Sequence, residues 1–208
     1  LESIWGDYLK LLKIALSDFV GESRDLREMK VARDIGIRVT VLCDESVNFR
    51  GNDIIDGFEV HRIPLLYRDK SLLIMMISMI PGIYRWIRYI QRLRPDIASC
   101  HDIIPQLIAY LAKVFSIRNR NMKLIYDSHE LEMDRSLNKR RKKWMKRPLM
   151  ILEKYLINHS DSTIVVSDSI ADVLVKTYNL RTEIAVVRNI PKFWIVDKNT
   201  CDKVRKDL

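Results

Sequence analysis

The chain has 208 residues, of which 48% are hydrophobic and 30% are charged. This length fits one domain with a short tail, and the composition excludes a disordered chain. The cysteines, Cys43, Cys100 and Cys201, lie far apart, which excludes a disulfide framework and a close-spaced zinc site. They favour a reducing cytoplasm. We expect no amino-terminal signal peptide, and Leu1 at the first position predicts a start inside a longer chain.

The formal net charge of +9 comes almost entirely from one segment. Residues 135–148 hold eight Lys and Arg residues and no acid, which leaves +1 for all other positions. A local patch of like charge is typical of a surface that meets phosphate groups, either in lipid or in nucleic acid.

The predicted elements alternate between strands and helices along the chain. Short apolar runs predict seven strands, at residues 12–16, 37–42, 58–63, 96–100, 123–126, 163–166 and 184–187. Most runs are continuous, as in strands that are covered on both faces, whereas 58–63 alternates and is expected nearer an edge. Helical spacing of apolar residues predicts helices around 26–33, 107–115, 149–157 and 170–178. This alternation indicates an α/β fold with a doubly wound, mainly parallel sheet of about seven strands.

Two further segments complete the organisation of the chain. The longest apolar run, 72–80, is stopped by Pro81 and Gly82 and is shorter than the roughly 20 residues that cross a bilayer, so no transmembrane helix is predicted. After residue 191 the sequence becomes polar and mixed. We therefore expect one domain at 1–191 and a linker at 192–208.

Candidate binding residues follow the strands, because an open parallel sheet binds ligands beyond the carboxyl ends of its strands. The polar or glycine residues at these positions are Asp18, Gly21 and Arg24 after the first strand, His101 and Asp102 after the fourth, Ser128, His129 and Glu130 after the fifth, Ser167 after the sixth, and Arg188 and Asn189 after the last.

Two of these strand ends carry a histidine followed by an acid. An imidazole titrates near neutral pH and can exchange protons or hydrogen bonds with a substrate hydroxyl. For His129 a functional role is favoured, because four polar residues stand in a row there. For His101 a structural alternative remains equally open, in which Asp102 caps the helix that enters at Pro105.

Glycine-rich phosphate loops are absent from the sequence, which argues against a dinucleotide-binding domain or a nucleoside triphosphatase. Gly21 nevertheless precedes a helix start at which Arg24 and backbone amides could hold an anion.

Two segments have the composition of membrane-contacting helices. Basic and aromatic residues beside an apolar run suit the headgroup region, and Lys and Arg near an anionic leaflet add to binding. The residues concerned are Arg85, Trp86, Arg88 and Arg92 in the first segment and Arg140, Arg141, Lys142, Lys143, Trp144 and Lys146 in the second. The alternative is a solvated helix face or a buried core helix. Nucleic acid is a less favoured partner, since single-strand binders interleave several aromatic residues with their cations.

Four stretches, in this order and spacing, resemble the amino-terminal domain of GT-B glycosyltransferases, in particular glycosyltransferase family four. They are SRDLREMK at 23–30 followed by GIRVTVLC at 36–43, PDIASCHD at 95–102, IYDSHE at 125–130 followed by the basic loop, and SDSTIVVSDSIA at 160–171 followed by VVRNIP at 186–191. The resemblance extends over about residues 12–191. Members of the family often carry paired glycines in the first loop, where this chain has Gly21 alone.

The resemblance implies a Rossmann-like acceptor-binding domain, one half of a GT-B fold, whose missing carboxyl-terminal domain holds most of a nucleotide-sugar donor. It implies glycosyl transfer with retention of configuration and with neither metal nor cofactor, to a glycan or lipid-linked acceptor, in surface polysaccharide or glycolipid synthesis. His129 matches the family's histidine beside the transferred sugar, and His101 and Asp102 match a motif that lines the cleft. The domain alone is expected to be inactive, and the whole enzyme is expected on the cytoplasmic face of the membrane.

Two alternatives remain beside this hypothesis. A sugar-nucleotide epimerase has a first domain of the same layout, although the membrane-type segments count against it. A non-enzymatic module that binds anionic lipid or nucleic acid through the basic run is the other.

Overall fold

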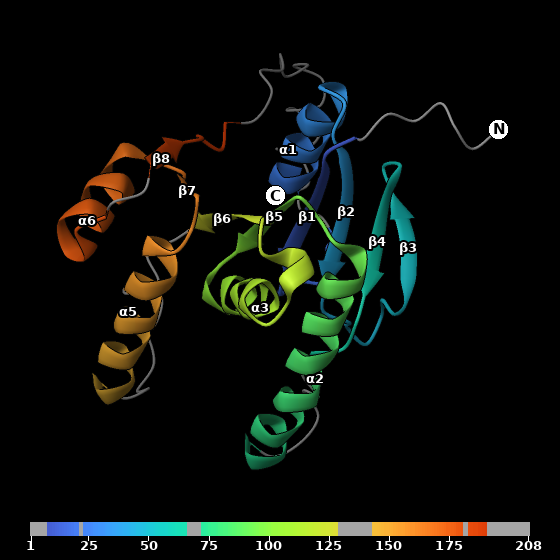
Figure 1. The fold of residues 1–208 in the computed structure, drawn as a ribbon, viewed down its shortest axis with the longest axis horizontal. Coiled ribbons are helices and arrows are strands. Elements are labelled where there is room, and N and C mark those ends of the chain that lie inside the picture. The colour runs from blue at the N-terminus through green and yellow to red at the C-terminus, as the bar shows by residue number, and fades with distance from the viewer. Residues whose placement is uncertain (1–7, 21–22, 66–71, 129–142, 181–182, 191–208) are drawn as a thin grey trace, which may run out of the picture.

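The computed structural model describes residues 8–20, 23–65, 72–128, 143–180 and 183–190. They form an eight-stranded sheet covered by helices (Figure 1). The strands are β1 (Lys10–Ala15), β2 (Arg38–Cys43), β3 (Asn52–Ile55), β4 (Phe58–Arg62), β5 (Ile97–His101), β6 (Lys123–Ser128), β7 (Ser162–Val165) and β8 (Glu183–Val186). The helices are α1 (Ser23–Asp34), α2 (Leu72–Leu93), α3 (Ile103–Val114), the short 3-10 helix η1 (Ile117–Asn119), α5 (Lys143–Asn158) and α6 (Asp168–Tyr178).

The order of strands in the sheet is β3-β4-β2-β1-β5-β6-β7-β8, and every neighbouring pair is parallel except β3 and β4. This confirms the predicted α/β class and the mainly parallel, doubly wound sheet, and each of the seven predicted strands is present. The alternating strand β4 is second from the edge, as expected. The missed strand is β3, which pairs with β4 through a turn in which Asp56 and Gly57 have φ of 52° and 83°.

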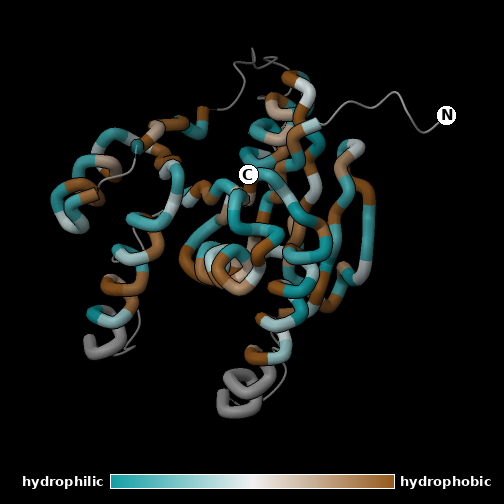
Figure 2. Tube along the Cα trace, viewed as in Figure 1, coloured by the Kyte–Doolittle hydropathy of each residue, from teal (hydrophilic) through white to brown (hydrophobic). Residues whose placement is uncertain are grey.

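The two faces of the sheet have separate hydrophobic cores. On one face Met29 of α1 packs with Val41 and Phe58. On the other face Leu12 and Leu124 pack against α2 and α3, and this core includes the buried thiol of Cys100, while Cys43 lies in the first core. A third cluster joins α3, α5 and α6 to β6 and β7. Figure 2 shows the hydrophobic and hydrophilic residues alternating along these helices.

The apolar run 72–80 stops at Pro81 and Gly82, but helix α2 contains both residues and continues to Leu93. Pro81 lies on the exposed side of the helix, and Gly82 lies buried against the chain before the helix. A Cβ atom at Gly82 would collide with the backbone carbonyl of Leu65. The glycine is therefore required by a close tertiary contact. Among the described residues no helix has both the length and the apolar character that crossing a bilayer requires.

Candidate functional site

The order in which strands are added to the sheet reverses at β1, which lies between β2 and β5. The connection through α1 leads to one side, and β5 with α3 leads to the other, so the carboxyl ends of β1 and β5 flank a topological switch point. In open α/β sheets, ligands bind in the crevice at such a point. His101 is the last residue of β5, and Ser128 is the buried last residue of the neighbouring β6.

A buried lysine connects the strands to α1 at this point. Lys13 of β1 is only 2% exposed, and its Nζ lies 3.0 Å from Asp25 Oδ1, 3.0 Å from Glu28 Oε2 and 2.8 Å from Asp127 Oδ2. Burial acts to lower the pKa of Lys13, but the carboxylates of Asp127, Asp25 and Glu28 raise it well above its ordinary value. The lysine therefore remains charged.

Arg24 lies beside this lysine in the same group of charges. Its Nε donates to Glu28 Oε1 at 2.8 Å and its Nη2 donates to Asp127 Oδ1 at 2.9 Å, while its buried Nη1 has no hydrogen-bond partner among the described residues. The prediction placed Arg24 at a helix start, available to an anion. The structure instead engages two of its nitrogens with carboxylates. We call Lys13, Arg24, Asp25, Glu28, Asp127 and His101 the ionic cluster.

The three carboxylates of the cluster have the spacing of a metal site, because one oxygen from each of Asp25, Glu28 and Asp127 lies within 4.8 Å of the others. The ammonium group of Lys13, however, already contacts all three carboxylates. It takes the place that a cation would occupy. The cluster is therefore a salt-bridge network, and we assign no metal to it.

His101 is the sixth member of the cluster and the one at the strand end. Its Nδ1 lies 3.6 Å from Asp25 Oδ2, and its side chain is 17% exposed. Burial acts to lower its pKa, but the close contact with Asp25 and the negative charges of Asp102, Asp25 and Asp127 raise the pKa above its ordinary value. The geometry favours an imidazolium at the carboxyl end of β5.

Asp102 has an unusual backbone conformation beside this histidine. Its φ of 72° and ψ of 178° fall in a region that is occupied almost only by glycine. It occupies the N-cap position of α3, but its side chain makes no capping hydrogen bond. The structural alternative is therefore confirmed in the place of Asp102 at the start of the helix, but a cap through its carboxylate is absent.

The remaining predicted residues near β7 and β8 have local partners. Ser167 is the N-cap of α6, where its Oγ accepts a hydrogen bond from the Ile170 amide at 3.3 Å. Arg188 forms an exposed ion pair with Asp168 at 2.7 Å. Asn189 accepts a hydrogen bond from Arg27 of α1. Because Ser167 has a helix-capping role and Arg188 is paired at the surface, neither joins the ionic cluster.

At the end of β1, the carboxylate of Asp18 accepts a hydrogen bond from the Val20 amide at 3.3 Å, and its carbonyl accepts one from Arg62 at 3.0 Å.

Gly21, His129 and Glu130 lie outside the described residues. The structure thus brings Arg24 and His101 together, with Ser128 at the next strand end. Sequence reasoning did not single out Lys13, Asp25, Glu28 and Asp127 as one group. A lysine with apolar neighbours on both sides in a strand was the available signal, since a buried charge needs a partner.

The family model described as Glycosyltransferase Family 4 matches residues 29–190. The chain belongs to glycosyltransferase family 4. No curated protein matches it in sequence. The family assignment confirms the resemblance carried by the four sequence stretches.

Solved structures share the fold of this family 4 chain at low sequence identity. Sucrose-phosphate synthase (tll1590) from Thermosynechococcus elongatus superposes with a TM-score of 0.71 at 10% identity, covering 96% of this chain and 53% of that one. The lipopolysaccharide outer core galactosyltransferase WaaB superposes with a TM-score of 0.60 at 16% sequence identity. The match covers 90% of this chain and 48% of WaaB. The catalytic domain of starch synthase IV from Arabidopsis thaliana superposes with a TM-score of 0.56 at 12% sequence identity. The match covers 86% of this chain and 52% of that one. The chain therefore spans about half the length of these proteins and has the fold of one half of a GT-B glycosyltransferase.

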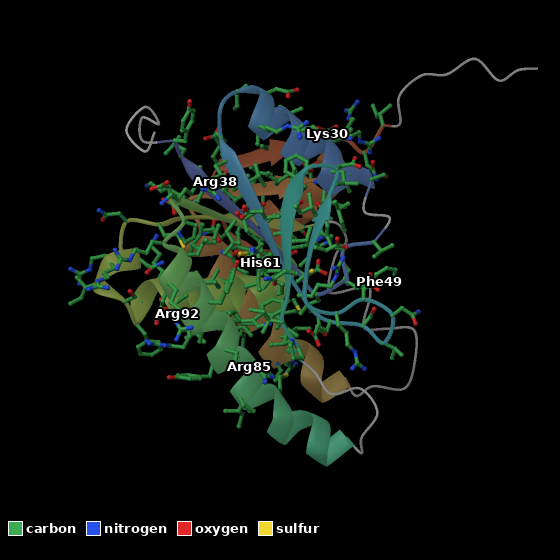
Figure 3. The ribbon with its side chains drawn as sticks, turned by 90° about the vertical axis from the view of Figure 1, so that its right-hand side faces the viewer. Lys30, Arg38, Phe49, His61, Arg85 and Arg92 are labelled. Atoms are coloured by element: carbon green, nitrogen blue, oxygen red, sulfur yellow. The ribbon has the colours of Figure 1, made fainter. Side chains whose placement is uncertain are left out.

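The predicted membrane residues of the family 4 domain are only partly at its surface. Trp86 is fully buried and its Nε1 donates to the Ile63 carbonyl at 2.9 Å, so the prediction that it contacts a membrane is wrong. Arg85 is half-buried and its Nη2 donates to the Pro64 carbonyl at 2.8 Å. Arg88 and Arg92 are exposed, and Figure 3 shows Arg85 and Arg92 along α2.

The second predicted membrane segment cannot be placed in the same way. Arg140, Arg141 and Lys142 lie outside the described residues. Lys143, Trp144 and Lys146 belong to the first turn of α5, where the backbone alone is described.

Proposed function

We propose that this chain is the amino-terminal, acceptor-side domain of a membrane-peripheral glycosyltransferase that uses a nucleotide-sugar donor. The supporting observation is the position of His101, at the carboxyl end of β5 beside the switch point of a family 4 domain. The acceptor-binding domain would comprise residues 1–191, and residues 192–208 would lead to a carboxyl-terminal domain that holds most of the donor.

Leaving-group chemistry explains why a cation belongs at this point. Glycosyl transfer from a nucleotide sugar leaves a nucleoside diphosphate, and donors or cations aimed at its developing charge lower the barrier. His101, with its raised pKa, supplies one such cation. His129 would lie beside the transferred sugar. We further propose that transfer proceeds with retention of configuration and without a metal ion.

The exposed side of α2 supports attachment to the cytoplasmic membrane face. Ile80 and Tyr84 are largely exposed, and Arg88 and Arg92 continue the same side of the helix at a spacing of four residues. An apolar and aromatic end followed by arginines is typical of an interfacial helix. In addition, α2 and α5 both follow carboxyl ends of strands and extend below the sheet in the view of Figure 1. The start of α5 therefore lies on the same side of the sheet as the start of α2 in this view.

The enzymatic proposal is tested with a panel of nucleotide sugars. The 208-residue chain and a longer protein that includes the carboxyl-terminal domain are each titrated, with heat of binding and donor hydrolysis as readouts. We expect only the longer protein to bind one donor and to hydrolyse it slowly. Tight binding of a nucleotide sugar by the 208-residue chain alone would overturn the proposed division between acceptor and donor domains.

Membrane attachment is tested by flotation with vesicles that contain phosphatidylglycerol. The double substitution R88E/R92E is expected to reduce the floated fraction, because it reverses two charges on the exposed side of α2. The matched control is R118E/R120E, which makes the same charge change at η1. Equal flotation of both variants, or poor flotation of the unaltered chain with neutral and anionic vesicles alike, would contradict the proposed attachment.

A further inference from the structure

The ionic cluster lacks one positive charge when His101 is neutral. Lys13 and Arg24 supply two cations, whereas Asp25, Glu28 and Asp127 supply three carboxylates. Buried charges are stable only when they are paired and hydrogen-bonded. A proton on His101 makes the cluster neutral, so the cluster and the histidine are linked through charge as well as through contact.

Asp25 is the residue that makes this link. Its carboxylate is 0% exposed and lies between Lys13, 3.0 Å from Oδ1, and His101, 3.6 Å from Oδ2. A fully buried carboxylate cannot touch a substrate in the cleft. His101, in contrast, is partly exposed at the strand end. Of the two residues that pair with Asp25, Lys13 is itself buried, so we expect an effect of Asp25 on a ligand to act through His101.

We propose that Asp25 is a positioning residue, which orients His101 and holds it as an imidazolium that binds a diphosphate group at the carboxyl edge of the sheet. This inference rests on the proposed function, in which that group belongs to the donor or to a lipid-linked acceptor. Asp25 itself makes no contact with the ligand.

Charged groups from four elements surround the histidine and set its state. Asp25 faces it from α1, Asp127 from β6 and Asp102 from the start of α3, and all three favour the imidazolium. Lys13 of β1 opposes the imidazolium by charge, but it is neutralised by the same carboxylates. Asp25 is the carboxylate that pairs with the imidazole, at 3.6 Å from Nδ1, which is why we expect its removal to have the largest effect.

The test is a pH titration of the histidine resonances by NMR in the 208-residue chain. The sequence has four histidines, and the substitution H101Q identifies the resonance of His101. We expect its midpoint in the unaltered chain to lie above 6.5 and to fall in D25N, which keeps the shape of the side chain and removes its charge. The matched control is D172N, at an exposed position of α6, which is expected to leave the midpoint unchanged.

A midpoint at or below 6.5 in the unaltered chain would overturn the proposal, and this measurement stands even if D25N does not fold. An unchanged midpoint in folded D25N would overturn it as well.

Ligand binding is tested with inorganic pyrophosphate as the probe. We expect pyrophosphate to raise the midpoint of His101 in the unaltered chain, and D25N to weaken binding at neutral pH by roughly the factor by which the protonated fraction falls. No response of His101 to pyrophosphate would overturn the diphosphate assignment. Tighter binding of UDP than of farnesyl diphosphate would assign the group to the donor, and the reverse order would assign it to a lipid-linked acceptor.

Failure of the proposed function gives a different result. In that case the longer protein hydrolyses no nucleotide sugar, while His101 still titrates with Asp25 and responds to pyrophosphate.

Discussion

Lys13 stands in the middle of β1, and three carboxylates surround its ammonium group. The substitution Lys13→Met keeps an unbranched chain of similar length but leaves these carboxylates, of which Asp25 and Asp127 are fully buried, without their common cation. Breaking a buried ion pair by removing one partner costs about 3–5 kcal/mol, so we expect a loss of that size in the free energy of unfolding. Urea denaturation measures it.

The matched control is Lys30→Met, since Lys30 forms an ion pair of 2.7 Å with Asp56 in which both side chains are about half exposed. Exposed pairs contribute about 0–1 kcal/mol. If the two substitutions cost the same, the buried network does not stabilise the fold in the way that its geometry indicates.

Asp102 carries backbone strain at the same site. Its φ and ψ of 72° and 178° cost a residue with a side chain about 1–3 kcal/mol, and glycine adopts them freely. We therefore expect Asp102→Gly to raise the melting temperature, although it removes a carboxylate that faces His101. Asp172→Gly inside α6 is the control and is expected to lower the melting temperature, because glycine weakens a helix interior. A lower melting temperature in Asp102→Gly would show that contacts of the carboxylate outweigh the strain.

At the scale of elements, α2 contains two adjacent residues whose replacement by alanine should have opposite effects. Gly82→Ala normally favours a helix, but here the new methyl group would meet the Leu65 carbonyl, and overpacking costs about 1–3 kcal/mol. Pro81→Ala restores a backbone donor on the exposed side of the helix and should stabilise it. Thermal unfolding of both variants tests the contrast, which fails if Gly82→Ala melts at or above the temperature of the unaltered chain.

The elements that could be predicted are those whose own residues determine them. Continuous apolar runs identified seven strands, because strands buried on both faces need them. β3 was missed because its side chains are mostly exposed and it lacks such a run. The Asp56–Gly57 pair, a strong hairpin signal, could have found it. The extent of α2 could not be read from the apolar run alone, because Gly82 serves a contact with Leu65, which helix propensity does not contain.

The candidate site was predictable only in part for a similar reason. His101 was recognisable from its place after a strand, but its partner Asp25 comes from a helix 76 positions earlier and Lys13 from a strand before that. Only the folded arrangement brings them together. Trp86 was misjudged because a tryptophan among arginines fits both an interface and a core, and burial alone decides between them.

For the whole molecule, the shifted groups predict how stability depends on pH. Burial acts to raise the pKa of Asp25, but the effects of His101 and Lys13 are larger and lower it. The contribution of Asp25 to the free energy of unfolding is therefore present above pH 3.8 and is lost as pH falls through the folded-state pKa. Burial raises the pKa of Glu153 despite hydrogen bonds from Tyr178 and Tyr126, and its contribution is complete below 4.5. The contribution of His101, whose pKa is also raised, is complete below 6.5.

The last two contributions are lost as pH rises through the folded-state pKa values, so we expect a larger free energy of unfolding at about pH 5 than at about pH 8. Urea denaturation at both values tests this, and His101→Gln and Glu153→Gln should each reduce the difference. Greater stability at the higher pH would contradict the assigned directions.

Two buried thiols, one in the core on each face of the sheet, make the opening of these cores measurable by chemical modification. Cys43 in β2 and Cys100 in β5 are both 0% exposed, and burial raises the pKa of the Cys43 thiol to about 12. An alkylating reagent needs the thiolate, so it can modify either cysteine only when the sheet opens. The rates at which the two thiols are alkylated therefore record how often the core on each face of the sheet opens, and equal rates would mean that both cores open in one event.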